Sequence, residues 1–147
     1  MNLVAENVQN FIKLSQNLTF ENFFQIICQH GNRIAAEYME DGKIKYMTYD
    51  AFGLLSRRIA YRLGELLGNE YRGRYVGIHL DNCPEWNSIF WGILMAGYHP
   101  ILLDFRATRE TLLHLLKESD ALAIITHEKE TIRSEERRVG KECRSRW

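Results

Sequence analysis

Two apolar patterns alternate between residues 75 and 126, and this alternation constrains the fold more than any other feature of the sequence. Short apolar runs typical of β-strands occupy Tyr75–Leu80, His99–Leu103 and Ala121–Thr126. The last two runs are nearly continuous, as in strands that are covered on both faces. Apolar residues spaced three or four apart separate the runs and predict helices. We therefore expect an α/β fold, a three-layer parallel sheet of βαβαβ type with right-handed crossovers.

Start and stop signals mark the two crossover helices. Pro84 suits the first turn of a helix, and Gly97 ends the apolar pattern that follows it. That pattern consists of Trp86, Phe90, Ile93 and Leu94. Thr108 is a good N-cap for the second helix, in which three leucines are expected to face the core. These are Leu112, Leu115 and Leu116.

The residues before the sheet predict a helix and a β-hairpin. Phe20–His30 is expected to be a short helix, with Thr19 as its N-cap and Gly31 at its end. Two short β-rich runs, Ile34–Tyr38 and Lys45–Tyr46, flank the dipeptide Asp41-Gly42. Because Asp-Gly favours the tight turns of hairpins, these runs are expected to pair.

A longer amphipathic helix is expected after the hairpin. Thr48 is a suitable N-cap, Asp50 places negative charge in the first turn, and Gly68 closes the pattern. The apolar residues form a single stripe, so one side of this helix is expected to be buried. The stripe consists of Phe52, Leu55, Ile59, Leu63 and Leu66.

Length and composition fit one globular domain. The chain has 147 residues, of which 46% are hydrophobic and 26% are charged. No apolar run approaches the ~20 residues of a membrane span, and the N-terminus lacks the pattern of a secretory signal. Cys28, Cys83 and Cys143 form no Cys-x-x-Cys pair. We therefore expect reduced thiols in a cytoplasmic protein.

The C-terminal segment differs from the rest of the chain. Residues 133–147 contain six basic and three acidic residues, although the whole chain has a formal net charge of zero. The segment has no hydrophobic period and is similar to the translation of a widely used sequencing adapter. We therefore interpret residues 133–147 as a non-native tail and residues 1–132 as the informative chain. The alternative is a basic docking tail or localisation signal, with nucleic acid or anionic lipid as its partner.

Candidate chemistry is sparse in residues 1–132. A nucleotide site needs a glycine-rich turn that cradles phosphate, and neither GxGxxG nor GxxxxGK[ST] occurs there. The turns after the first two strands contain Asp81 and Asp104, whose negative charge would repel phosphate. Asp104 follows the carboxyl end of a strand, where ligands bind, but a capping or turn role explains it as well and is expected. The histidines lack metal-ligand spacing; they are His30, His79, His99, His114 and His127.

Trp86, Phe90 and Trp91 form an aromatic cluster with two possible roles. Exposed aromatic rings can stack on nucleic-acid bases. At helical spacing between two buried strands, however, such residues more often belong to the core. We expect the core role, and we assign no catalytic, cofactor-binding or metal-ligating residue in this chain.

Four segments stand in register between Asn32 and Thr126: Thr48–Phe52, Ser56–Ala60, Val76–Trp86 and Gly92–Asp104. Together they resemble the opening of the AMP-binding, acyl-adenylate-forming superfamily, which includes acyl-CoA synthetases, peptide-synthetase adenylation domains and luciferases. Asn-x-Pro-Glu-Trp at 82–86 and Phe-Trp-Gly-Ile at 90–93 are more similar to the acyl-CoA synthetases. Ala51 and Arg74 depart from the family pattern, which has Glu and Asp at these places.

The resemblance implies that this chain is the N-terminal part of an AMP-forming acid–thiol ligase. The parent protein would activate a carboxylic acid with ATP and Mg²⁺ to an acyl-adenylate, then transfer the acyl group to CoA or a carrier-protein thiol. The family's phosphate loop, ribose contact and catalytic lysine all lie beyond the equivalent of Ile132. The chain alone is therefore expected to be inactive and to contain no cofactor. An uncovered strand edge after Ala121–Thr126 is expected to make it self-associate.

Two other functional classes remain as alternatives. One is a small stand-alone α/β binding or interaction module without enzymatic activity. The other is a nucleic-acid-binding domain, which depends only on the basic segment 133–147. The residues do not indicate which acid or which thiol acceptor the parent would use.

Overall fold

The computed structural model describes residues 8–13 and 16–127, which belong to two compact units, Met1–Leu54 and Leu55–Trp147. The first unit contains a helical segment at residues 8–13, helix α2, strands β1 and β2 and the start of helix α3. The second unit contains the rest of α3 and the alternating strands and helices. Each unit is described separately below.

Helix α2, Phe20–Cys28, begins where the sequence predicts. The side chain of Thr19 accepts a hydrogen bond from the backbone N–H of Asn22 at 3.1 Å, so Thr19 is the N-cap. The helix ends two residues earlier than His30, with Gln29 as its C-cap. Phe24 is 2% exposed, and its ring centroid lies 5.6 Å from that of Phe52.

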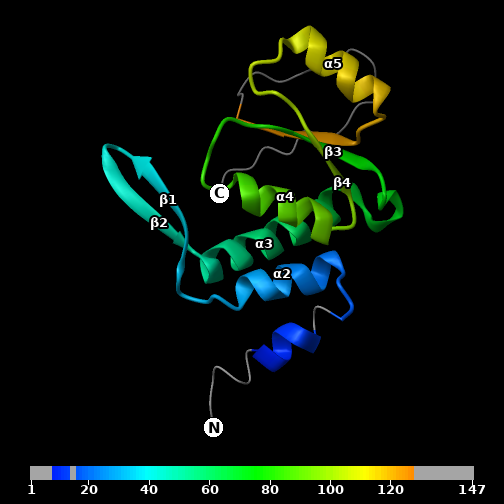
Figure 1. Cartoon of the computed structure of the whole chain (residues 1–147). Coiled ribbons are helices and arrows are strands. Elements are labelled where there is room, and N and C mark those ends of the chain that lie inside the picture. The colour runs from blue at the N-terminus through cyan, green and yellow to red at the C-terminus, as the bar shows by residue number, and fades with distance from the viewer. Residues whose placement is uncertain (1–7, 14–15, 128–147) are drawn as a thin grey trace. The chain divides into compact units, whose positions relative to one another are not determined.

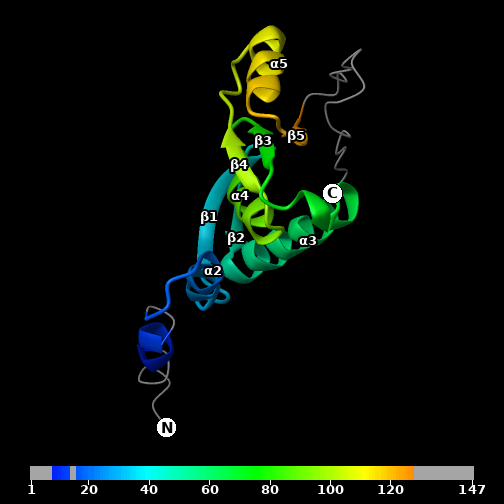
Figure 2. The same cartoon turned by 90° about the vertical axis from the view of Figure 1, so that its right-hand side faces the viewer.

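Strands β1, Ile34–Glu40, and β2, Lys43–Thr48, form the expected antiparallel hairpin, which Figures 1 and 2 show from two sides. Glu40 pairs with Lys43, so the loop has two residues. Asp41 and Gly42 both have positive φ, 50° and 72°. Since a type I′ turn requires positive φ at both central residues, Asp-Gly explains the hairpin locally.

Helix α3, Tyr49–Leu67, is capped by Thr48, whose hydroxyl accepts from the backbone N–H of Ala51 at 3.2 Å. Four of the five predicted stripe residues are buried or half-buried, but Leu66 is 39% exposed. The prediction for Leu66 was wrong, because in the last turn Leu67 packs against the buried cluster instead. Gly68 closes the helix with a φ of 88°, which glycine adopts without steric cost.

The second unit contains a three-stranded parallel sheet in the order β4-β3-β5. The strands are β3, Tyr75–His79; β4, His99–Leu102; and β5, Ala123–Thr126. The crossover helices are α4, Trp86–Met95, and α5, Arg109–Glu118. A single 3₁₀ turn, η1, spans Asn69–Tyr71. The structure thus confirms the predicted α/β fold with a parallel βαβαβ sheet.

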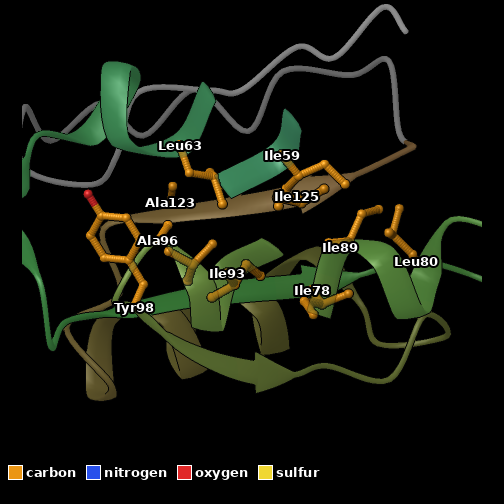
Figure 3. Close-up of a cluster of buried hydrophobic side chains, with 11 residues drawn as sticks. Ile59, Leu63, Ile78, Leu80, Ile89, Ile93, Ala96, Tyr98, Ala123 and Ile125 are labelled. Atoms are coloured by element: carbon orange, nitrogen blue, oxygen red, sulfur yellow. The ribbon is translucent and has the colours of Figure 1, made fainter. Parts of the chain in front are cut away.

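The sheet is covered on both sides. The larger buried cluster, here called the main cluster, lies on the side of α4 and draws residues from α3, β3, α4 and β5. Figure 3 shows these side chains pointing into one shared interior. The smaller cluster, here called the α5 cluster, consists of Leu103, Leu112, Leu116 and Ala121. In Figure 1, α4 and α5 lie on opposite sides of the strands, which gives three layers.

Three sequence-based expectations about the second unit were wrong. Leu115 is 40% exposed, because only Leu112 and Leu116 of α5 turn toward the sheet. Pro84 lies in a turn before α4, whose N-cap is Glu85. Strand β4 is not covered on both faces, since Leu102 is 58% exposed. The strand also lies at an edge, because it pairs only with β3 among the described strands. Burial of a short strand depends on strand order, which the apolar pattern does not encode.

The N-cap of α5 gives a direct test of these local signals. The Thr108 hydroxyl accepts from the backbone N–H of Thr111 at 3.3 Å. We expect Thr108→Ala to lower the free energy of unfolding by about 1 kcal/mol, because a helix N–H loses its acceptor. Thr108→Ser keeps the hydroxyl and is expected to change stability by less than half as much. Urea unfolding of the three proteins measures this, and equal losses in both variants would contradict the capping role.

Candidate functional site

The carboxyl edge of the parallel sheet is the place where a ligand site is expected. After β3 the chain passes to α4 on one side of the sheet, and after β4 it passes to α5 on the other side. The strand order β4-β3-β5 reverses direction at β3, so the carboxyl ends of β3 and β5 flank a topological switch point, where open α/β sheets bind their ligands. The residues at this edge are His79, Asp81, Asp104 and Thr126.

His79 is a buried polar residue at this edge, for which the sequence indicated only that it lacks metal-ligand spacing. Its side chain is 3% exposed, and its Nδ1 lies 3.3 Å from the Thr126 hydroxyl oxygen. Its Nε2 is buried and has no hydrogen-bond partner among the described residues. The parallel register pairs His79 with Thr126 and Gly77 with Ile124, which places these residues on the α5 side of the sheet. In the sequence, His79 lies two residues after Gly77, so the two residues face the same side of the strand. The register is needed to tell that this is the α5 side.

Asp104 performs the turn role that the sequence predicted. One carboxylate oxygen, Oδ1, accepts from the Arg106 backbone N–H at 2.9 Å and from Arg106 Nε at 3.1 Å. The other, Oδ2, accepts from Arg106 Nη2 at 3.1 Å. These hydrogen bonds from Arg106 lower the pKa of Asp104 below its usual value. Asp104 therefore stays ionised and paired, which does not suit a general acid or base at neutral pH.

The turn after β3 carries no activated nucleophile. Burial raises the pKa of the Cys83 thiol, and the nearby negative charge of Glu85 raises it further. A thiol with a raised pKa is protonated at neutral pH and reacts slowly, because the thiolate is the nucleophile. The Asp81 carboxylate is engaged by the backbone N–H of Asn82 at 2.6 Å. This turn is thus arranged as a connection between β3 and α4.

Two of the three residues of the aromatic cluster, Trp86 and Phe90, are half-buried and pack against the core, as expected. The Trp86 and Phe90 rings are stacked, with centroids 5.9 Å apart and planes 8° apart, and both side chains pack against the main cluster. Phe90 and Trp91 meet edge to face, with centroids 6.1 Å apart. Since Trp86 and Phe90 are committed to packing, the structure does not support a platform for base stacking.

The described residues were also compared with two other kinds of site. Across residues 8–13 and 16–127, no group of three or more His, Cys, Asp or Glu side chains lies together in a way that could hold a metal ion. No helix in the same residues is long and apolar enough to cross a membrane. Sequence predictions for residues 133–147, including the non-native tail and Cys143, lie outside the described residues.

A double-mutant cycle tests the environment of His79. We expect Thr126→Val to lower the free energy of unfolding by about 1–3 kcal/mol, because it leaves a second nitrogen of a buried imidazole unpaired. In a His79→Leu background there is no imidazole nitrogen that could lose its hydrogen-bond partner, so the same change is expected to cost less than half as much. Equal costs in both backgrounds, measured by urea unfolding, would contradict the hydrogen bond between the two side chains.

The fold and the family comparison define the class of protein. Many nucleotide-dependent enzymes contain a parallel sheet with helices on both sides. Such sheets bind their ligands at the carboxyl ends of the strands. The family model described as AMP-binding enzyme matches residues 23–146. The chain belongs to this AMP-binding family, which the resemblance of the four sequence segments predicted. No curated protein sequence matches the chain.

Solved structures with the same fold include adenylation domains and a CoA ligase. The N-terminal subdomain of Klebsiella oxytoca NpsA, in complex with 3-hydroxybenzoyl-AMSN, has a TM-score of 0.67 at 15% identity over 82% of this chain. The nonribosomal peptide synthetase FmoA3 has a TM-score of 0.67 at 22% identity over 84% of this chain. A benzoate CoA ligase from Burkholderia xenovorans LB400 has a TM-score of 0.61 at 20% identity over 73% of this chain. At these identities the likeness concerns the fold.

This chain spans only a small part of those proteins. The aligned region covers 29% of the NpsA chain, 21% of the benzoate CoA ligase chain and 14% of the FmoA3 chain. The described residues accordingly correspond to one structural layer of those longer proteins. Their polar groups at the carboxyl edge are engaged with one another or buried.

Proposed function

We propose that the parent of this chain is an ATP-dependent ligase that activates a carboxylic acid as an acyl-adenylate and then transfers the acyl group to a thiol. The observation that carries the proposal is the AMP-binding family match over residues 23–146, on a chain whose parallel sheet has the fold of adenylate-forming enzymes. The similar structures include a complex with 3-hydroxybenzoyl-AMSN, a form bound to alpha-methyl-L-serine-AMP and a benzoate CoA ligase. An amino acid joined to AMP and a ligase that uses benzoate and CoA both support chemistry at a carboxyl group.

The described residues do not fit the nucleotide itself. A phosphate needs convergent backbone N–H groups from a glycine-rich turn, or positive side chains. The turns at the carboxyl edge instead present the carboxylates of Asp81 and Asp104, and Arg106 is already bonded to Asp104. We therefore place the sites for ATP and Mg²⁺ in other parts of the parent, with residues 1–132 as its opening segment.

CoA is the acceptor that we favour, in a cytoplasmic enzyme. Support comes from the segments Asn82–Trp86 and Phe90–Ile93, which are more similar to acyl-CoA synthetases than to peptide-synthetase adenylation domains. The structural neighbours include both kinds, among them a fusion of an adenylation domain with a carrier protein from Klebsiella oxytoca. A carrier-protein thiol is therefore the acceptor against which CoA is to be tested.

Trapping with hydroxylamine tests the reaction. The protein encoded by the complete reading frame is incubated with Mg-ATP, a panel of fatty and aromatic acids and hydroxylamine, which converts acyl-adenylates to hydroxamates. We expect hydroxamate from at least one acid, and its replacement by a thioester when CoA is supplied instead. Thioester formation on a carrier protein but not on CoA would identify a carrier-protein thiol as the acceptor. Absence of hydroxamate with every acid, from a folded protein, would contradict the proposed function.

A further inference from the structure

The tip of the β1–β2 hairpin carries a dipeptide whose two residues can react with each other. Asp41 is followed by Gly42, and no other Asp or Asn of the chain is followed by glycine. Both residues are exposed, and a Cβ built on Gly42 would meet no atom within 4 Å. Because glycine has no side chain, other groups approach its backbone closely. The Gly42 nitrogen is therefore sterically open to the carboxyl group of Asp41.

The reacting groups of this dipeptide are also free of hydrogen bonds within the part of the chain that the structure describes. There the Asp41 carboxylate accepts no hydrogen bond and forms no ion pair, and the Gly42 N–H donates none. The carboxylate of Asp104, by contrast, is held by hydrogen bonds from Arg106. Local backbone geometry is thus what restrains Asp41 and Gly42.

We propose that Asp41-Gly42 is a site of spontaneous backbone isomerisation through a succinimide, and that opening of the hairpin tip controls its rate. The Gly42 nitrogen attacks Cγ of Asp41, and the new N–C bond closes the ring while the amide proton and a carboxyl oxygen leave as water. Water then cleaves the bond between the Asp41 main-chain carbonyl carbon and the Gly42 nitrogen. The chain continues through Cβ and Cγ as isoaspartate, and the water taken up balances the water released.

The folded turn holds the reacting atoms apart. Asp41 has a φ of 50°, in the left-handed region, where the Cβ of a residue lies close to that residue's own carbonyl oxygen. This oxygen and the next nitrogen lie on opposite sides of the carbonyl carbon, because the peptide unit is planar. The Gly42 nitrogen therefore points away from the Asp41 side chain. The succinimide forms only when the tip leaves the type I′ turn.

The described contacts that hold the tip closed are weak. The last backbone pair of the hairpin joins Glu40 to Lys43, and an ion pair joins the side chains of Glu40 and Lys45. These two side chains are 52% and 48% exposed, so their ion pair adds little stability. Ends of elements open locally at a lower free energy than the whole chain unfolds. The reaction is therefore slowed in the folded protein but not blocked.

The product does not fit the turn. Isoaspartate adds a methylene to the main chain inside a loop of two residues, so the pair Glu40–Lys43 no longer closes in its former register. Each rearranged chain therefore keeps an open tip, and the rearranged form accumulates with time. Both reacting groups belong to one dipeptide, so the reaction needs no other part of the parent protein.

Incubation of the chain in warm neutral buffer, with and without guanidinium chloride, tests the proposal. Trypsin releases residues 34–43 as one peptide, in which electron-transfer fragmentation distinguishes isoaspartate from aspartate of equal mass. We expect isoaspartate at position 41 in both samples. It should form at least about tenfold more slowly in the folded chain, because only the locally opened fraction reacts.

Asp120 is the internal control, because it has nearly the same φ, 51°, and a different neighbour. Ala121 follows it, and the Ala121 N–H donates to the Leu116 carbonyl at 3.1 Å. The tryptic peptide of residues 118–129 is therefore expected to contain no isoaspartate in the folded chain, and far less than the peptide 34–43 in the unfolded one.

Asp41→Asn gives a second readout, because Asn-Gly favours the same type I′ turn. Its ring closure releases ammonia instead of water, so conversion changes the mass of the peptide. The same slowing in the folded chain is expected, with circular dichroism as the check that the variant is folded. Absence of isoaspartate in the unfolded chain, or equal rates in the folded and unfolded chains, would overturn the proposal.

Discussion

Replacing Gly92 with valine is expected to lower the free energy of unfolding by about 3 kcal/mol or more. Overpacking a well-packed core costs about 1–3 kcal/mol. Even a Cβ alone would clash at this position, and valine adds further atoms beyond the Cβ. A Cβ at Gly92 would lie 2.5 Å from Cγ2 and 2.7 Å from Cβ of Ile59, and 3.0 Å from the Ser56 carbonyl oxygen. Ile59 is 1% exposed and branched at Cβ, so it has little room to turn away. Gly92 therefore sets how closely α4 can approach α3.

Gly64 provides the matched control for this prediction. It lies inside α3, and a Cβ built on it would meet nothing within 4 Å. Gly64→Ala is expected to raise the free energy of unfolding by up to about 1 kcal/mol, through helix propensity alone. Gly92→Ala gains the same propensity but is expected to be net destabilising. Urea unfolding compares the variants, and equal stability of Gly92→Ala and Gly64→Ala would contradict the close contact between the helices.

Truncating Ile93 is expected to have the second large effect, a loss of about 2–5 kcal/mol in the free energy of unfolding for Ile93→Ala. Ile93 is fully buried in the main cluster, where it points toward residues of β3, α3 and β5 (Figure 3). Leu102→Ala is the control, because Leu102 is 58% exposed and its truncation is expected to cost less than about 0.5 kcal/mol. Chemical unfolding measures both. A loss at Ile93 as small as that at Leu102 would mean that the main cluster is not the core of this unit.

The features that the sequence predicted correctly are those that neighbouring residues determine. Thr19, Thr48 and Thr108 each accept a hydrogen bond from an N–H three residues further on, so each helix start is encoded within one turn. Asp41-Gly42 fixes the hairpin because both residues adopt positive φ. The alternation of strand and helix patterns predicted the parallel sheet, because a parallel pair needs a crossover connection.

The features that the sequence did not predict depend on contacts between distant segments. The apolar runs of β4 and β5 look alike, but β4 pairs only with β3 among the described strands, and its Leu102 is exposed. His79 is buried with one nitrogen unpaired because register places it beside Thr126 on the α5 side of the sheet. At the site, the turn role of Asp104 was predictable because its partner Arg106 is two residues away. The family was predictable because four short segments keep their order and spacing across the chain.

ATP–pyrophosphate exchange separates the role of this chain from that of its parent most directly. The chain of 147 residues and the protein encoded by the complete reading frame are assayed side by side with Mg-ATP, labelled pyrophosphate and a panel of carboxylic acids. We expect exchange that depends on the acid from the longer protein, and none above background from this chain, whose carboxyl-edge turns present carboxylates to a phosphate. On this account, the chain is the opening part of its parent and has no nucleotide site of its own. Two results would contradict the account: saturable exchange by this chain alone, or no exchange by the folded longer protein with any acid.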